Sequence, residues 1–500
     1  MKFIFDNSYA RELKGFYESS LPSASAAPEL VYFNSSLANQ LQLNQQNLNA
    51  AELADIFSGN RLPEHAEPIA QAYAGHQFGQ FNPQLGDGRA LILGEILDND
   101  KNRFDICLKG SGKTPYSRGG DGKAALAAML REVLIAEAMH ALGIPTTRSL
   151  AVVGTGEQVF RDPPQPGAVL TRTAASHIRI GTFQFFAARE QYDKVKTLAD
   201  YSISRHDSDL IDDKQRYVKF LRAVINRQAL LIAKWMGVGF IHGVMNTDNI
   251  TIAGETIDYG PCAFMENYDP KAVFSSIDHQ GRYAYGNQPA IAQWNLARLA
   301  ETLIPLIDSD KDKAVEIATE ELNGFALAYQ NQLRKVMRQK LGLKADNQSL
   351  NDTDDKLVTD WLDLLEKNTV DFTLAFRSLC DMADGNSEKL LDLFADKPDV
   401  ELWLAEWQKR CKSEDALWGN TGSANESRAN AMRKVNPWII PRNHRVEEAL
   451  QAASDLNNFS LFENLLAALE QPYIEQTKFE SLTIPASASF TDNYRTFCGT

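Results

Sequence analysis

The sequence has no hydrophobic run long enough to cross a lipid bilayer. A spanning helix needs about 20 consecutive apolar residues, whereas the best candidate, residues 230–241, is short and interrupted by Lys234. The opening residues, MKFIFDNSYARELKGF, contain neither a long apolar core nor a small-residue cleavage site, and acidic residues come early. We therefore predict no membrane partner, no secretory signal and no transit peptide.

Cysteine is also scarce. The chain has five among its 500 residues, Cys107, Cys262, Cys380, Cys411 and Cys498, odd in number and without C-x-x-C spacing. This pattern argues against a zinc site and against the disulfide framework of a secreted protein. We expect the protein to work in the reducing cytoplasm.

Positive charge is in deficit. Lys and Arg number 51 against 65 Asp and Glu, which gives a net charge of −14. A chain this acidic repels the phosphate backbone of nucleic acids at long range. We therefore expect no nucleic-acid partner, although a local basic pocket remains compatible with this charge. The length is typical of roughly three domain-sized units with a large core, and we expect a monomer.

The stretch 241–261, IHGVMNTDNITIAGETIDYGP, gathers polar residues around a predicted hairpin. Two β-prone runs flank the turn-forming pair Ala253-Gly254. A hairpin symmetric about that turn would place Asn249 opposite Asp258. An amide oxygen beside a carboxylate suits Mg²⁺ or Mn²⁺, and Asp248 offers a second carboxylate. The alternative is a polar surface hairpin, because Asn, Asp and Gly are ordinary turn residues.

Residues 70–180 are typical of a β-rich lobe that grips a nucleotide. The turn QLGDGR, residues 84–89, precedes the strand-like run 90–97. Gly86 and Gly88 let the backbone approach phosphates closely, and Arg89 adds positive charge. An ordinary turn is the alternative, since a lone G-x-G pair is a weak signal.

A P-loop is excluded, although GSGKTPYSRGGDGK at residues 110–123 invites the comparison. The pattern G-x-x-x-x-G-K-[ST] needs its first glycine where Cys107 stands for one frame and Ser117 for the other. We therefore reject that nucleotide-binding motif.

Lys109 ends a second strand-like run, FDICL, and Asp121 and Gly122 open a helix predicted over residues 123–142. The helix prediction depends on apolar residues at i, i+3, i+4 and i+7, and Glu132 lies off that stripe. A strand lysine followed by a helix glutamate is the pair that positions the phosphate-binding lysine of kinases. A glutamate on a solvated face is the more common alternative.

Two arginines lie on either side of a predicted bend, residues 174–177. Arg172 ends a strand-like run and Arg179 follows the bend. Such a pair can clamp phosphate oxygens, whereas an arginine taken alone is usually a surface residue.

These pieces follow the order of the protein-kinase fold: a glycine-rich turn, Lys109, Glu132, the loop 242–249 and Asp258. Kinases carry H-R-D or H-G-D in that loop, but here Val244 stands where the catalytic aspartate belongs. Valine cannot accept the proton of a hydroxyl nucleophile. Transfer of the γ-phosphate is therefore disfavoured, and a catalytically silent scaffold is the other alternative. The retained lysine and metal-type residues argue against the scaffold.

The chain resembles most closely the selenoprotein O family of protein adenylyltransferases, pseudokinases by sequence. The resemblance runs over nearly the whole chain, and its late part, NPWIIPRN at residues 436–443, is less distinctive. It is carried by FDNSYA at 5–10, QAYAGHQFG at 71–79, LKGSGKTPYSR at 108–118, HGVMNTDN at 242–249 and DYGP at 258–261.

The resemblance implies an α+β, protein-kinase-like bilobal fold, with a β-rich N-lobe, a helical C-lobe and a helical C-terminal extension. The corresponding domains are an N-terminal extension at 1–60, the N-lobe at 61–185, the C-lobe with the catalytic loop at 186–330, and the extension and tail at 331–500.

The resemblance also implies an activity. Members of this family bind ATP turned around relative to a kinase, transfer AMP to Ser, Thr or Tyr hydroxyls of proteins, and release pyrophosphate. UMP transfer from UTP remains an open alternative, as does the choice between Mg²⁺ and Mn²⁺. By the family's motifs, Asp248 would be the general base, Asn249 and Asp258 the metal ligands, Lys109 a phosphate ligand oriented by Glu132, and Gly86, Gly88, Arg89, Asp121, Gly122, Arg172, Arg179 and Asp258 the nucleotide site.

The same resemblance implies a redox pair. Eukaryotic members carry selenocysteine near the C-terminus, and Cys498 occupies the comparable place. Cys262 follows the DYGP motif, where a kinase begins its mobile activation segment. A reversible Cys262–Cys498 disulfide is therefore expected, with two ordinary free thiols as the alternative.

Overall fold

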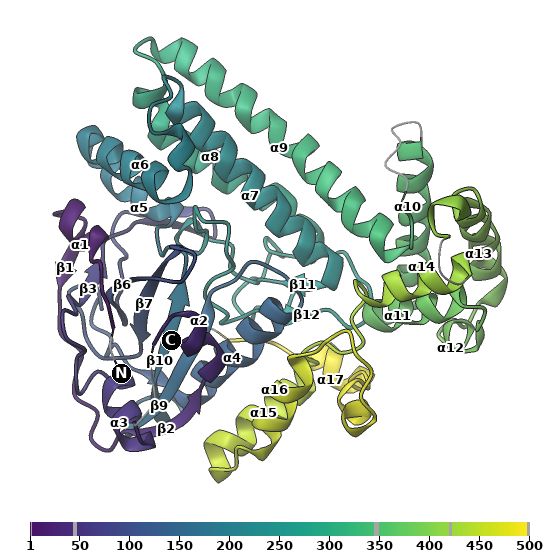
Figure 1. Cartoon of the computed structure of the whole chain (residues 1–500), viewed down its shortest axis with the longest axis horizontal. Helices are drawn as coiled ribbons and strands as arrows, with labels where there is room; N and C mark the ends of the chain where they lie inside the picture. Colours follow the sequence, from purple (N-terminus) through teal and green to yellow (C-terminus); the bar gives the residue numbers. More distant parts are fainter. Residues whose placement is uncertain (2, 44–47, 345–349, 420–422, 498–500) are drawn as a thin grey trace.

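The computed structural model describes residues 1, 3–43, 48–344, 350–419 and 423–497. Its first part is built on an eight-stranded antiparallel sheet of order β1-β3-β6-β7-β10-β9-β2, with β8 paired to β10 (Figure 1). The strands are β1 Tyr17–Ser19, β2 Glu29–Phe33, β3 Ile69–Gln71, β6 Ala90–Leu97, β7 Arg103–Lys109, β8 Ala124–Ala125, β9 Arg148–Val159 and β10 Gln165–Ala174. Two short pairs lie apart from the sheet, β4 Gly75–Gln77 with β5 Gln80–Asn82, and β11 Phe240–Ile241 with β12 Ala263–Phe264.

The register of the central strands puts two cations on one face of the sheet. Arg172 on β10 pairs with Cys107 on β7, and Leu170 pairs with Lys109. Paired residues point to the same face, and so do residues two apart along a strand. Lys109 and Arg172 therefore project from the same face of neighbouring strands.

Helix α4, Leu126–Ala141, covers the face from which Lys109 and Arg172 project. It contacts β9 and β10 on one side and the late helices α15 and α16 on the other. Twelve of its 16 residues are buried, which is typical of a helix enclosed by protein rather than lying at a surface. The remaining helices before it are α1 Ser8–Glu12, α2 Ser35–Gln40 and α3 Ala50–Phe57.

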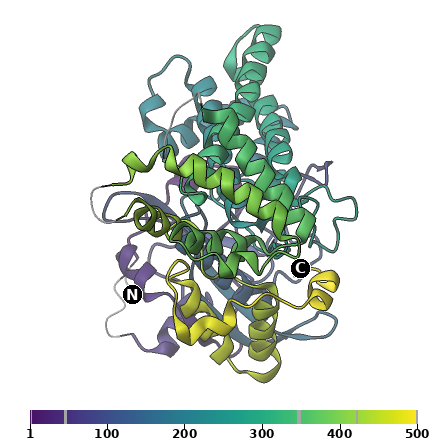
Figure 2. The ribbon, with the colours of Figure 1, turned by 90° about the vertical axis from the view of Figure 1, so that its right-hand side faces the viewer.

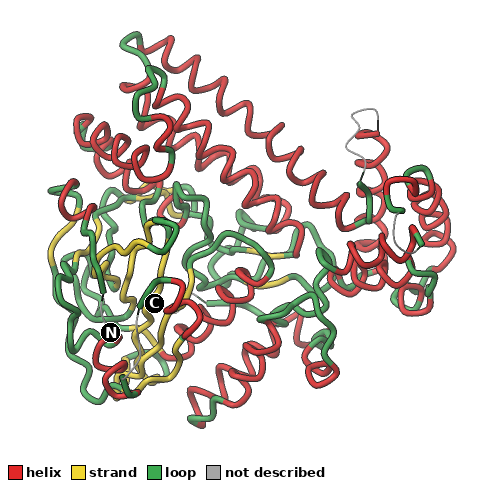
Figure 3. Tube along the Cα trace, in the orientation of Figure 1, coloured by secondary structure: helices red, strands yellow, loops and turns green. Residues whose placement is uncertain are grey.

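The rest of the chain is helical, and Figure 3 shows the strands gathered in one part of the molecule with helices around and beyond them. The first group is α5 Ile180–Ala187, α6 Tyr192–His206, α7 Arg216–Val238, α8 Gln288–Ile307 and α9 Lys311–Lys340. The second is α10 Asn351–Asn368, α11 Phe372–Ala383, α12 Glu388–Leu391, α13 Lys397–Lys412 and α14 Ala424–Arg433. The last is α15 Asn443–Leu456, α16 Ser460–Leu469 and α17 Ala488–Asn493, which lies below the second group in Figure 2.

This arrangement is a kinase-like bilobal fold, as the sequence predicts. Helix α7 ends at Gly239, whose φ of 73° closes the helix in the left-handed conformation that glycine adopts without steric cost. The chain then enters β11 and the loop that carries Asp248. No helix in the described ranges is long and apolar enough to cross a membrane. The predicted domain boundaries remain predictions; β1 and β2, from the first 60 residues, join the same sheet as the later strands.

Two local predictions are wrong. The helix predicted from residue 123 begins at Leu126, because Ala124 and Ala125 pair with β10 instead. The hairpin predicted around residues 253–254 does not form. Thr251 bridges to Arg179 and Thr256 to Thr146, so each arm pairs with a different outside segment rather than with the other arm.

The physical reason lies in the backbone hydrogen bonds of the two arms. Ile252 N donates to Ile178 O at 3.1 Å on one side, and Thr256 N donates to Pro145 O at 3.0 Å on the other. Buried amides must be paired, and these partners lie far away in the sequence. Asn249 and Asp258 are therefore not opposite one another in a hairpin register.

Candidate active site

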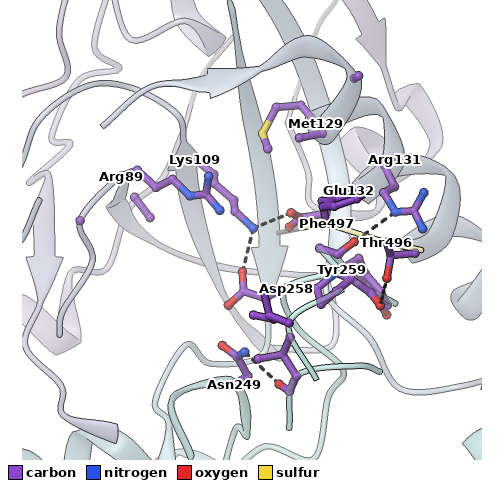
Figure 4. Close-up of a pocket in the computed structure, with 18 of the residues that line it drawn as sticks. Arg89, Lys109, Met129, Arg131, Glu132, Asn249, Asp258, Tyr259, Thr496 and Phe497 are labelled. Carbon is purple, nitrogen blue, oxygen red and sulfur yellow. Dashed lines mark hydrogen bonds and ion pairs between the residues drawn. The ribbon is translucent and has the colours of Figure 1, made fainter. Parts of the chain in front are cut away.

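One cavity of about 1580 Å³ lies where β7, α4, β10 and the loop after β11 meet. Segments far apart in the sequence line it, including the C-terminal residues 493–497. Among the predicted site residues that the structure describes, all but Cys262 line this cavity: Gly86, Gly88, Arg89, Lys109, Asp121, Gly122, Glu132, Arg172, Arg179, Asp248, Asn249 and Asp258. Figure 4 shows several of these side chains converging from opposite walls.

Lys109 and Glu132 form a direct ion pair. Lys109 Nζ donates to Glu132 Oε2 at 2.5 Å and to Asp258 Oδ1 at 2.8 Å (Figure 4). Glu132 is only 3% exposed, so the alternative of a solvated glutamate does not apply. Glu132 lies off the apolar stripe because it faces the charged partners Lys109 and Arg172, and not because it faces water.

Arg172 joins the same cluster from β10. One of its terminal nitrogens donates to Asp258 Oδ1 at 2.7 Å and to Glu132 Oε1 at 3.1 Å. Burial alone would raise the pKa of Asp258, but the charges of Lys109, Arg172 and Arg179 hold that pKa well below its usual range. Asp258 is therefore an anion, and its backbone φ of 63° is a conformation that non-glycine residues adopt only under constraint.

Arg179 is the less tightly paired cation of the site. Its guanidinium lies 3.5 Å from Asp87 and 3.9 Å from Asp258, and stacks over Tyr73 at 4.5 Å from the ring centroid. Its buried Nε has no hydrogen-bond partner among the described residues. A buried donor without a partner is costly, and a phosphate oxygen would satisfy it.

Two glycine-containing segments pack against each other at the cavity wall. A Cβ on Gly88 would lie 2.9 Å from Tyr116 O, and one on Gly122 would lie 2.1 Å from Gly112 O. Only glycine allows these approaches. Asp121 forms an ion pair with Arg161 at 3.0 Å, and Arg161 lies two residues after the end of β9. The Asp121 carboxylate therefore anchors this segment to the end of β9.

Asp248 lies in a short 3₁₀ turn, Thr247–Asn249, and is buried. Burial raises the pKa of Asp248 to about 6. Gln77 Nε2 donates to Oδ2 at 3.1 Å, whereas Oδ1 is buried and has no partner among the described residues. Val244, at the kinase base position, is a buried apolar residue that accepts only through its backbone oxygen, from Asn249 Nδ2 at 3.0 Å.

The site fits a divalent cation that arrives with phosphates. Because Asn249 Nδ2 is engaged by Val244 O, the amide oxygen is left as a ligand, and the ionised Asp258 supplies carboxylate oxygen. No group of three or more His, Cys, Asp and Glu side chains in the described part of the chain could hold a metal unaided. Mg²⁺ commonly takes one or two protein ligands and completes its shell with substrate phosphates and water.

Cys262 is not among the residues that line the cavity. Cys262 is fully buried, and burial raises the pKa of its thiol to about 11. Cys498 lies outside the described residues. The tail just before it does lie against the segment that carries Cys262, because Thr496 Oγ1 donates to Pro261 O at 2.7 Å.

Several residues that the sequence did not predict also support the site. Arg131 on α4 donates to Cys262 O at 2.7 Å and to Glu447 at 2.8 Å, which ties α4 to both the loop and α15. Gln77 lies in one of the family-like motifs, which was the available signal. Glu447 and Tyr494 carry no sequence signal, because each contacts the site through Arg131, more than 300 positions away in the sequence.

Comparison with known proteins identifies similar chains. The family model described as "Protein adenylyltransferase SelO" matches residues 1–470. A relative from Cereibacter sphaeroides, named "Protein nucleotidyltransferase YdiU", is 53% identical over 501 residues and 100% of both chains. Relatives of the same name include one from Chromobacterium violaceum, 54% identical over 96% of this chain and 98% of its own. Another, from Rhizobium meliloti, is 52% identical over 100% of this chain and 99% of its own.

Lys109→Ala and Glu132→Ala should each weaken ATP binding about tenfold or more, and the double variant should be little weaker than the worse single one. The reason is that Glu132 holds Lys109, the lysine predicted to bind phosphate. Calorimetric titration of metal–ATP into the four proteins measures the coupling. The exposed pair Lys409–Glu406 on α13 is the matched control and should show no effect. Fully additive losses at Lys109 and Glu132 would contradict the coupling.

Proposed function

Because the chain belongs to the SelO family of protein adenylyltransferases, we propose that it transfers AMP from ATP to a Ser, Thr or Tyr hydroxyl of a protein substrate. Two observations together carry the proposal. Val244 stands at the kinase base position, and Asp248 offers a buried carboxylate with one oxygen that accepts no hydrogen bond from the described residues. The cavity thus has no carboxylate where a γ-phosphate kinase needs its base, and has one four residues later.

In the proposed reaction, Asp248 takes the proton of the acceptor hydroxyl. The hydroxyl oxygen forms a bond to the α-phosphorus, the bond from that phosphorus to the β-phosphate oxygen breaks, and pyrophosphate leaves. ATP lies turned around relative to a kinase, so that the α-phosphate faces the acceptor. This step needs charge neutralisation and positioning more than covalent help.

The cations of the cluster suit that requirement. Lys109 and Arg172 are already held by Glu132 and Asp258, so they need little reorganisation to meet phosphate oxygens, and Arg179 offers its unpaired Nε. A divalent cation bound by Asn249, Asp258 and the phosphates would add further neutralisation of the triphosphate. These supports favour catalysis over a silent scaffold, which has no use for a charged, open cavity.

Label from α-phosphate-labelled ATP should appear covalently on protein, and label from the γ-position should not. The physical reason is the missing base at Val244. The purified protein is incubated with each labelled ATP, with Mg²⁺ or Mn²⁺, and with α-labelled UTP in parallel to decide the nucleotide. Transfer of γ-label at a comparable rate would establish a kinase instead, and no transfer of either label would favour the scaffold.

Asp258→Ala should abolish metal-dependent ATP binding, whereas Asp248→Ala should lower kcat by about 10²–10⁴-fold and change binding little. Asp258 pairs with Lys109 and Arg172 and is the predicted metal ligand, but Asp248 only has to accept a proton. Calorimetry of metal–ATP binding, with and without a chelator, separates the two roles. Equal loss of binding in both variants would contradict this division.

We further propose that Cys262 and Cys498 form a reversible disulfide that changes activity with redox state, as the family resemblance implies. Two thiols would give up two electrons and two protons to an oxidant such as glutathione disulfide. The contact of Thr496 with Pro261 supports the proposal, because it brings the tail to the segment that carries Cys262. The raised pKa of the Cys262 thiol implies slow oxidation at neutral pH.

Non-reducing peptide mapping of the oxidised protein should recover one peptide pair joining Cys262 to Cys498, and reductant should change the rate of AMP transfer. Cys498→Ala should remove both effects, whereas Cys411→Ala, which removes a buried thiol of another region, should remove neither. The redox proposal is wrong if no such peptide pair forms and reductant leaves the rate unchanged.

A further inference from the structure

The β4–β5 hairpin lies across the loop that carries Asp248. His76 N donates to Thr247 Oγ1 at 2.7 Å, and Phe78 N donates to Asn246 Oδ1 at 3.1 Å. Gln77, between them, donates to Asp248. Three consecutive hairpin residues therefore hold three consecutive residues of the loop, although the two segments are about 170 positions apart in the sequence.

The hairpin comes unusually close to the Asp248 carboxylate. A Cβ built on Gly75 would lie 2.5 Å from Asp248 Oδ1, so only a glycine permits this approach. On the other oxygen, Gln77 Nε2 donates to Oδ2 at 3.1 Å. Oδ1 remains buried and has no donor in the described part of the chain.

The hairpin itself is held firmly on both sides of Gln77. On one side, Thr247 Oγ1 donates to Gln184 Oε1 at 2.6 Å, and the Gln184 amide nitrogen lies 2.8 Å from His76 Nδ1, which closes a cycle with the His76–Thr247 bond. On the other, Tyr283 OH donates to Asn246 Oδ1 at 2.6 Å. A side chain supported in this way can fix the orientation of the group that it binds.

We propose that Gln77 is a positioning residue for Asp248: its amide fixes the carboxylate through Oδ2 and leaves Oδ1 for the proton of the acceptor hydroxyl. The inference depends on the proposed function, because it gives Gln77 a role only if Asp248 is the base. A carboxylate oxygen that is buried without a donor gains a hydrogen bond when a hydroxyl approaches it. Gln77 acts through Asp248 and forms no bond with the substrate in this step.

Gln77→Met tests the amide directly, because methionine keeps the length and apolar stem of glutamine but cannot donate. We expect kcat for AMP transfer to fall about tenfold, since a hydrogen bond to a charged group contributes this much to its placement. KM for ATP should stay within about twofold. Gln80→Met is the matched control, because Gln80 pairs with Gln77 in the same hairpin but is exposed and lies outside the cavity lining. It should leave kcat unchanged.

A cycle with Asp248→Ala distinguishes positioning from general support of the fold. If Gln77 acts through Asp248, adding Gln77→Met to Asp248→Ala should lower the residual rate no further. A Gln77→Met variant with wild-type kcat, or losses that multiply in the double variant, would overturn the inference while leaving the proposed function intact. Absence of AMP transfer by the wild-type protein would overturn both. Thermal melting of each variant, expected within a few degrees of wild type, shows that a loss of rate is not a loss of folding.

Discussion

The site depends on a largely buried cluster of opposite charges, Lys109, Glu132, Arg172 and the partly exposed Asp258, which come from β7, α4, β10 and the loop after β11. A charge removed from water is costly unless it is paired and hydrogen-bonded. Each of the four charged side chains forms ion pairs with two others. The four elements must therefore meet before any one of these charges can be buried without a large cost in free energy. The sheet register contributes by placing the two cations on one face.

The helix that carries Glu132 connects this cluster to the end of the chain. Arg131, its neighbour on α4, donates to Gly260 O and Cys262 O, and to Glu447 on α15. Tyr494 OH donates to the same Glu447 carboxylate at 2.7 Å. The C-terminal extension therefore covers the outer side of α4 and borders the cavity.

The loop places a buried carboxylate away from the position of the kinase base. Val244 packs in the interior, and His242 Nε2 donates to Ile257 O at 2.9 Å, so the start of the loop is structural. The carboxylate of this loop belongs instead to Asp248, in a 3₁₀ turn that accepts hydrogen bonds from the β4–β5 hairpin. Burial and the lack of a donor on one oxygen favour proton acceptance there. The geometry around Asp248 thus depends on a hairpin that no kinase motif includes.

Local patterns in the sequence were enough to predict the strand at 90–97, most of helix α4 and the order of turn, lysine, glutamate and loop, because these depend on periodicity and on neighbours a few residues away. The family resemblance added the expected roles of the candidate residues. The tertiary structure alone decided that Glu132 is buried, since its partners Lys109 on β7 and Arg172 on β10 meet α4 only in the folded chain. It also decided that the arms around residues 253–254 pair with Arg179 and Thr146 rather than with each other. Backbone amides and buried charges take whichever partners the packed chain brings to them, and a sequence read locally does not contain those partners.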